Sequence, residues 1–105
     1  MGSSADVDIA VNAANQAFKN FSLSSKKERL ELLESILKIL IERNEEIAKA
    51  IMEEMGAPWT LALKAQAESG PQQFKAIIDV LKNYSFEEMI GSTCVAKEAI
   101  GVCAM

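Results

Sequence analysis

Histidine is absent from this chain, and cysteine occurs only as Cys94 and Cys103. The lack of histidine excludes Ser-His-Asp triads, HExxH zinc sites and mixed Cys/His zinc fingers. The spacing of the two cysteines matches no CxxC metal or redox motif. Because both lie among small apolar residues, we expect buried reduced thiols, with a disulfide or a reactive thiol as the alternatives.

Basic residues are also few, since 11 Lys and Arg face 15 Asp and Glu for a net charge of −4. This balance argues against a nucleic-acid partner, which would require a basic surface. No uncharged apolar run reaches the roughly 18 residues that a membrane span requires. The first residues also lack the basic and apolar regions of a signal peptide. We therefore expect a soluble cytoplasmic protein without a membrane partner.

The length of 105 residues suits one small domain, and half of these residues are hydrophobic. Apolar residues at steps of three and four predict helices over about 6–20, 25–55, 58–69 and 71–84. Ser3 or Ser4 can cap the first helix, and Ser25 with Glu28 forms a capping box for the second. Gly56 and Pro58 predict a tight turn between helices, and Pro71 predicts a kink or a restart with Ser69 as cap.

The long second helix has an apolar seam that can be written as heptads. Leu30, Leu37, Asn44 and Ile51 then occupy a, and Leu33, Leu40 and Ile47 occupy d. An Asn at a can set the register of a coiled coil, but Ile36 and Ile39 widen the seam into an ordinary amphipathic face. Opposite charges four residues apart (Lys27/Glu31, Glu34/Lys38 and Glu45/Lys49) predict a solvated outer face.

The last residues differ from the helical part because β-branched residues replace the helical spacing. We predict a connector over 85–91 and β segments over about 93–97 and 100–105. The apolar run from Ile100 to Met105 is typical of a parallel strand covered on both faces. The predicted fold class is therefore mainly α, a bundle of three to four amphipathic helices with a short C-terminal β segment. It forms a single partial domain over 1–105, the front piece of a larger α/β protein.

No residue pattern predicts a catalytic, cofactor-binding or metal site. Glu53 and Glu54 are adjacent on a helix and point about 100° apart, so they do not converge on one substrate. Lys97 and Glu98 point to opposite faces of a strand. The glycines form neither GxGxxG nor GxxxxGK[ST], so no phosphate loop is expected.

The order of short motifs along the chain resembles the aldehyde dehydrogenase superfamily. Residues 6–18 resemble its "DVdxAVxxAxxAF" helix, and Glu28-Arg29 with Leu32-Leu33 resembles "xxRxxLL". Residues 42–48 resemble "xRxeElA", and residues 54–58 resemble "ExGkP" with Ala57 in place of Lys. Residues 97–102 resemble "rEPiGV", with Ala99 in place of Pro.

This resemblance implies an N-terminal fragment of an enzyme that oxidises an aldehyde to a carboxylic acid with NAD or NADP. The family's nucleophilic cysteine, its glutamate base and its oxyanion-binding asparagine belong to motifs that this sequence lacks. Neither Cys94 nor Cys103 occupies the nucleophile's motif. The resemblance therefore implies that the fragment is inactive and binds no cofactor by itself, which leaves open whether the chain should be called an enzyme.

Two other functions are compatible with the residues. The chain is alternatively a self-associating helical interaction module, forming a homo-oligomer through an exposed apolar helix face and the C-terminal strand. A coiled-coil adaptor built on the heptad seam ranks below both.

Overall fold

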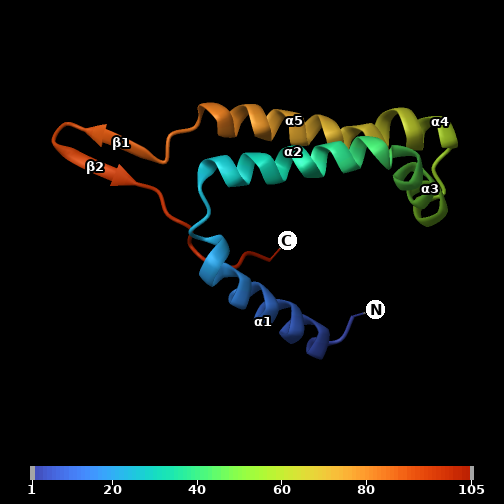
Figure 1. Ribbon diagram of the computed structural model, residues 1–105. Coiled ribbons are helices and arrows are strands. Elements are labelled where there is room, and N and C mark those ends of the chain that lie inside the picture. Colours follow the sequence, from blue (N-terminus) through green and yellow to red (C-terminus); the bar gives the residue numbers. More distant parts are fainter. Residues whose placement is uncertain (1, 105) are drawn as a thin grey trace. The chain divides into compact units, whose positions relative to one another are not determined.

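The computed structural model describes residues 2–104, and helices dominate it (Figure 1). The elements follow the order α1 (Ser4–Phe21), α2 (Lys26–Glu42), α3 (Asn44–Met55), α4 (Trp59–Leu61), the π-helix η1 (Ala62–Gln66), α5 (Ala67–Asn83), β1 (Glu87–Ile90) and β2 (Thr93–Ala96). The predicted class, mainly α with a short β segment, is confirmed.

The chain divides into two compact units instead of the single domain predicted over 1–105. One unit is formed by the chain up to Ser25 and from Ser85 onward, and the other by Lys26–Tyr84. The reason is that helices α2 to α5 pack on one another, whereas α1 buries none of its residues.

Helix α1 begins at a capping box formed by Ser3 and Asp6. The Asp6 N–H donates to Ser3 Oγ at 3.4 Å, and the Ser3 N–H donates to Asp6 Oδ2 at 2.7 Å. Each group satisfies a donor that the first helical turn leaves unpaired. The helix occupies Ser4–Phe21, where the periodicity predicts about 6–20.

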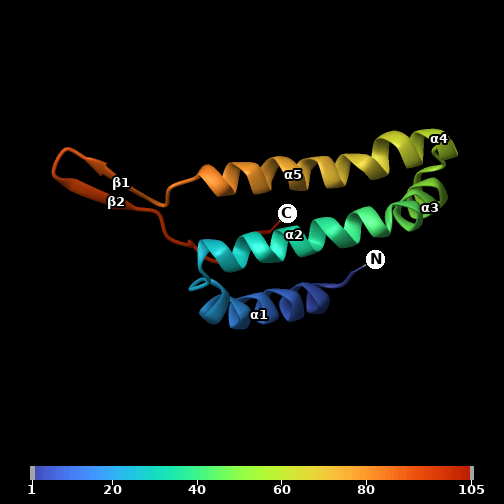
Figure 2. The same ribbon diagram turned by 45° about the horizontal axis from the view of Figure 1, so that its top comes forward.

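In the second unit, α2 and α5 run side by side in opposite directions (Figures 1 and 2). Lys82 Nζ of α5 lies 3.2 Å from Glu34 Oε1 of α2. Lys26 Nζ donates to the carbonyl oxygens of Lys82 and Tyr84 at 2.8 and 2.9 Å, where α5 ends. A cation at a helix C-terminus donates hydrogen bonds to the unpaired carbonyls and interacts favourably with the negative end of the helix dipole.

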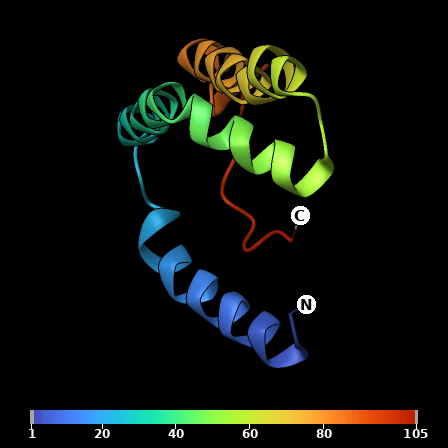
Figure 3. The same ribbon diagram turned by 90° about the vertical axis from the view of Figure 1, so that its right-hand side faces the viewer.

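The single helix predicted over about 25–55 is wrong, because Arg43 separates α2 from α3. Its backbone leaves the helical region at φ −100° and ψ 18°. Figure 3 shows α2 nearly end-on and α3 from the side, so the two helices run in different directions. This turn brings Ala48 against Ala62 and Ala67, the small buried core of the unit, with Ile47, Ile51, Ala57 and Leu63 packed around it. A continuous coiled-coil seam through Asn44 is therefore excluded.

The turn between α3 and α4 uses the glycine that the sequence predicts. Gly56 adopts a left-handed conformation at φ 69°, and its N–H donates to the Met52 carbonyl at 2.9 Å. Pro58 precedes the first turn of α4 and does not lie inside it, one residue from the predicted position.

The break predicted between about 58–69 and 71–84 is also wrong, since the helical backbone continues through Pro71. Ser69 does not cap a new helix, because its hydroxyl donates to the Gln66 carbonyl at 2.7 Å. The irregularity lies five to nine residues before Pro71, in the π-helix Ala62–Gln66. A π-turn inserts an extra residue into the helix and changes which side chains face a neighbour.

The residues predicted as a connector over 85–91 contain a strand instead. Strand β1 pairs antiparallel with β2, with Glu87 opposite Ala96 and Ile90 opposite Thr93. The two-residue turn between them has Gly91 at φ 63°, as tight hairpin turns require.

The strand predicted over about 100–105 is wrong for residues 100–104, which have no regular structure; Met105 lies outside the described residues. Ile100 is 95% exposed. A strand needs a hydrogen-bonding neighbour, and the only sheet in the described range is the β1–β2 pair.

Candidate functional site

Two shallow hollows adjoin Asn44, where α2 gives way to α3. The first has a volume of ≈250 Å³ and is lined by Ile41, Asn44, Glu68, Pro71, Gln72 and Lys75. The second, of ≈540 Å³, shares Ile41, Asn44 and Glu68 with it and adds side chains such as Lys49 and Lys64. Both belong to the Lys26–Tyr84 unit.

The polar groups around these hollows form structural contacts and no reacting constellation. The Asn44 Oδ1 atom is buried without a hydrogen-bond partner in the described chain, and so is Gln66 Oε1. Arg43 donates to Glu46 Oε2 from Nη2 at 2.8 Å and from Nε at 3.0 Å. This contact, in which two guanidinium N–H groups share one carboxylate oxygen, lowers the pKa of Glu46 and raises the pKa of Arg43. Such a pair fixes two side chains at the start of α3 and supplies neither a nucleophile nor a proton carrier.

The cysteines are exposed, so the prediction that both are buried is wrong. Cys94 lies on β2 opposite Met89, in a two-stranded sheet with no third strand among residues 2–104. Cys103 lies in the irregular segment after β2. Apolar neighbours in sequence predicted burial, but no second layer of their own unit covers these residues. Both thiols are free, which excludes a disulfide between them in this structure.

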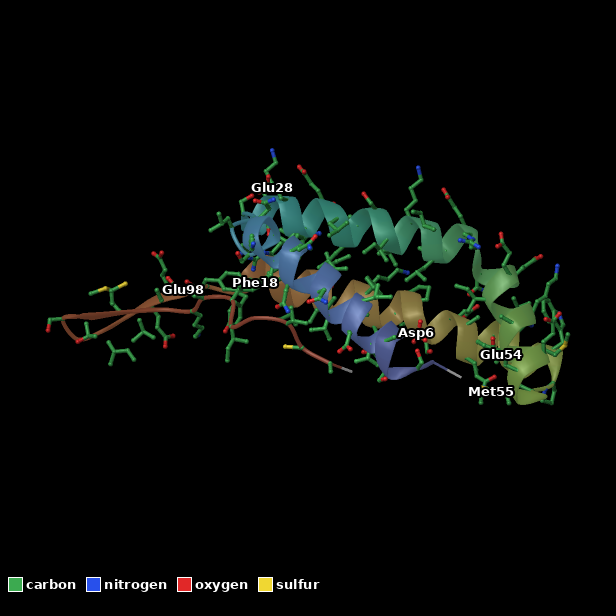
Figure 4. The ribbon with its side chains drawn as sticks, turned by 90° about the horizontal axis from the view of Figure 1, so that it is seen from below. Asp6, Phe18, Glu28, Glu54, Met55 and Glu98 are labelled. Atoms are coloured by element: carbon green, nitrogen blue, oxygen red, sulfur yellow. The ribbon has the colours of Figure 1, made fainter. Side chains whose placement is uncertain are left out.

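The glutamates considered in the sequence analysis, Glu53, Glu54 and Glu98, do not converge on a common site. Glu53 and Glu54 are exposed on α3, and Glu98 is exposed after β2 (Figure 4 labels Glu54 and Glu98). Lys97 Nζ lies 4.0 Å from Glu88 Oε2 across the hairpin, so its partner is Glu88 and not its neighbour Glu98. Of the predicted pairs on the outer face, Lys27–Glu31 occurs at 3.7 Å, whereas Lys38 lies near Glu42 and Glu34 near Lys82.

No described group of three or more His, Cys, Asp or Glu side chains could hold a metal ion. The residues present also do not fit a dinucleotide. Gly56, Gly91 and Gly101 adopt positive φ at separate turns or irregular positions, and no glycine-rich loop joins a strand to a helix. Such a loop is what cradles a pyrophosphate. Within residues 2–104, no helix has the length and hydropathy to cross a membrane.

Sequence reasoning found Asn44 as a polar residue in an apolar seam but did not predict the hollows beside it. Glu68, Gln72 and Lys75 reach them because α5 continues through Pro71. The signal that could have indicated this is the spacing of residues 68, 72 and 75, which places all three side chains on one helix face.

The described residues thus form packed helices and a two-stranded hairpin. A family model described as "Aldehyde dehydrogenase family" matches residues 1–105. The chain belongs to the aldehyde dehydrogenase family, and it corresponds to an N-terminal segment of such an enzyme.

Individual relatives agree with this assignment. The chain is 46% identical to a 3-succinoylsemialdehyde-pyridine dehydrogenase from a Pseudomonas species. The match of 106 residues covers 100% of this chain and 22% of that protein. An aldehyde dehydrogenase structure from Bartonella henselae matches with a TM-score of 0.84 and 40% identity, over 88% of this chain and 19% of the other. A mutant aldehyde dehydrogenase C from Pseudomonas syringae, solved with NAD+ and octanal, matches with a TM-score of 0.84 and 39% identity, over 89% and 19%. The chain therefore spans about 22% of the length of its curated relative.

Proposed function

We propose that these residues serve an NAD(P)-dependent enzyme that oxidises an aldehyde to a carboxylic acid, and that they supply helical support and no reacting group. The observation that carries this proposal is the 46% identity across the whole chain to a dehydrogenase of a semialdehyde. The octanal bound by the P. syringae relative supports an aldehyde as the substrate class. On this proposal the 105 residues alone are inactive and bind neither NAD nor NADP.

The absence of reacting groups supports the inactive state of the isolated chain. Aldehyde oxidation of this kind needs an activated nucleophile and preorganised donors for the oxyanion. Cys94 and Cys103 are exposed thiols, and in the described range neither a histidine nor a cationic ion-pair partner activates them. The proposal places the enzyme in the cytoplasm, the compartment in which free thiols stay reduced.

A chimera tests the proposal directly. In it, residues 1–105 replace the matching segment of the non-mutant aldehyde dehydrogenase C of P. syringae, and NADH formation is measured with octanal and NAD+. We expect a soluble chimera that retains at least a tenth of the parent's kcat. The purified chain alone should form no NADH under the same conditions. A folded chimera without turnover, or genuine turnover by the chain alone, would contradict the proposal.

We also propose that the chain self-associates, as the exposed hairpin suggests. Strands β1 and β2 form a two-stranded sheet, so within residues 2–104 the outer edge of each strand lacks a neighbouring strand. Met89 and Ile90 on β1 are 65% and 62% exposed. Unprotected edges pair with other chains. The hairpin here takes the role that the sequence suggested for a strand over 100–105.

Sedimentation analysis of two variants tests this second proposal. Ile90→Lys adds a charge to the edge strand and should shift the chain from oligomer to monomer at the same concentration. Lys27→Glu on the exposed face of α2 alters charge without touching the hairpin and should leave the oligomer unchanged. A wild-type chain that remains monomeric at high concentration would rule out self-association.

A further inference from the structure

The larger of the two hollows at Asn44 lies where α3 packs against the π-helix η1, and we call it the α3–η1 hollow. Its volume of ≈540 Å³ falls within the range of small-molecule sites. Ile41 and Leu63 supply apolar side chains to it, and Asn44 supplies an amide. Its other lining residues carry charges of both signs: Glu42, Glu45, Glu46, Lys49, Lys64 and Glu68.

Two couples of opposite charge in this hollow are four residues apart in sequence, Glu45 with Lys49 and Lys64 with Glu68. On an α-helix this spacing brings side chains together, and on α2 it gives an ion pair at 3.7 Å. Within residues 2–104, however, none of these four side chains takes part in an ion pair or a hydrogen bond. The α3–η1 hollow therefore presents two carboxylates and two ammonium groups that are available to a ligand.

The π-helix η1 explains why Lys64 and Glu68 stay apart. Lys64 lies within Ala62–Gln66, where backbone hydrogen bonds span five residues instead of four and each turn holds an extra residue. Across such a turn, residues four apart do not stand directly above one another, so the two charges remain separate. Turns of this kind occur frequently at functional sites.

The mixture of charges indicates what kind of ligand suits the α3–η1 hollow. A simple anion is attracted by the lysines but repelled by the glutamates, and a simple cation meets the reverse. A zwitterion satisfies both signs at once. Since Ile41 and Leu63 line the same hollow, a zwitterion with an apolar side chain also buries apolar surface there.

We propose that the α3–η1 hollow binds a free α-amino acid with a branched apolar side chain. The carboxylate of the ligand pairs with Lys64, its ammonium group pairs with Glu68, and its side chain contacts Leu63. The inference does not depend on the proposed function, because the hollow lies within the Lys26–Tyr84 unit and uses residues of that unit alone.

NMR titration of the chain with L-leucine tests this site. We expect saturable shifts at the Asn44 side-chain amide and at the backbone amides of residues 63–68. The dissociation constant should be about 1–10 mM, because exposed ion pairs each contribute little. L-leucinamide lacks the carboxylate and 4-methylpentanoate lacks the ammonium group, so each should bind about fivefold more weakly. Equal binding of the three ligands, or no saturable shift with L-leucine at about 50 mM, would overturn the proposal.

Variants that remove one charge each assign the two ends of the ligand. Lys64→Met should weaken L-leucine binding about fivefold and leave L-leucinamide binding unchanged, whereas Glu68→Gln should weaken L-leucine binding and leave 4-methylpentanoate binding unchanged. Lys27→Met and Glu53→Gln make the same changes outside the hollow and should alter the affinity less than about twofold. Circular dichroism checks that helix content is equal in all four. Equal weakening of every ligand by Lys64→Met and Glu68→Gln would contradict the assignment.

The competing arrangement is an ion pair between Lys64 and Glu68 themselves in solution. Urea unfolding of the ligand-free single and double variants distinguishes the two, because side chains in contact give non-additive losses of stability. We expect the losses from Lys64→Met and Glu68→Gln to add. Non-additive losses would show that the two charges satisfy each other, and would overturn the site.

Discussion

At the scale of single residues, the neighbours Lys26 and Lys27 make contacts of different kinds, and we expect them to contribute differently to the free energy of unfolding. Lys27 makes an exposed pair with Glu31 at 3.7 Å, of the kind that the spacing predicts. Lys26 is half-buried and donates to two carbonyls that lie 56 and 58 residues away in sequence. The pair within one helix is visible in the sequence, whereas the contact between helices depends on how α2 and α5 pack.

Replacing each lysine with methionine separates these two roles. Lys26→Met removes two charge-assisted hydrogen bonds at the end of α5 and should lower the free energy of unfolding by about 1 kcal/mol. Lys27→Met removes only an exposed helical pair and should cost at most about 0.5 kcal/mol. Urea unfolding followed by circular dichroism gives both values. Equal losses for the two variants would contradict the role assigned to Lys26.

The cap of α1 predicts a pH effect of defined sign. Backbone and side-chain hydrogen bonds from Ser3 lower the pKa of the Asp6 carboxyl below its ordinary value of 3.8. A lowered carboxyl pKa stabilises the folded cap above the ordinary pKa, and this contribution is lost as pH falls through the lowered folded value. Acidification should therefore fray the first turn of α1.

An NMR titration of the Asp6 carboxyl checks this. The wild-type pKa should lie below 3.8. In Ser3→Ala the pKa should move part of the way back, since the backbone donor remains while the hydroxyl is lost. Ser4→Ala should leave it unchanged, because the hydroxyl that bonds Asp6 belongs to Ser3. An Asp6 pKa at or above 3.8 in the wild-type chain would show that the cap does not form in solution.

At the scale of elements, apolar periodicity predicted the existence of the helices better than their interruptions. Repeats at steps of three and four indicate α1 and the regions of α2, α3 and α5, because each helix presents one apolar face. The turn at Arg43 does not interrupt the apolar periodicity of the sequence. The helical hydrogen bonds also continue on both sides of it, because the Arg43 N–H donates to the Ile39 carbonyl and the Ile47 N–H donates to the Arg43 carbonyl. The π-helix and the passage through Pro71 depend likewise on packing.

Hairpin β1–β2 has a local turn signal in the sequence, although the prediction over 85–91 was a connector. Gly91 and Ser92 separate two four-residue strands, and glycine followed by serine is a typical two-residue hairpin turn. The acidic pair Glu87 and Glu88 obscured the first strand, because charged residues are depleted in strands. The apolar run at 100–104 predicted a strand that the structure lacks, since a hydrophobic segment forms a strand only beside a hydrogen-bonding neighbour.

The contact between α3 and η1 yields a prediction of its own. Ala48 and Ala62 are fully buried, so the two helices approach closely there. Ala48→Leu should overpack this contact and cost about 1–3 kcal/mol. Ala50→Leu adds the same side chain at an exposed position of α3 and should change the stability by at most about 0.5 kcal/mol. Thermal unfolding compares the two, and equal melting temperatures would contradict the close approach.

At the scale of the whole molecule, the candidate site was less predictable than the fold class. Composition predicts few reacting groups, since a chain without histidine has few means of acid–base catalysis, and this stays a prediction. The hollows at Asn44 did not follow, because they depend on the direction of α3 relative to α5. The family followed from the order of weak motifs, each of which alone indicates little.

The central proposal is that these residues serve as the helical support of an aldehyde-oxidising enzyme and contribute no reacting group. The most direct measurement is the kcat for octanal of a chimera that carries residues 1–105 in the non-mutant aldehyde dehydrogenase C of P. syringae, relative to that of the unaltered enzyme. The account predicts a kcat within about tenfold of the parent, since the reacting groups stay in place and the barrier changes by at most about 1.4 kcal/mol. A soluble, folded chimera with no detectable NADH formation would contradict it.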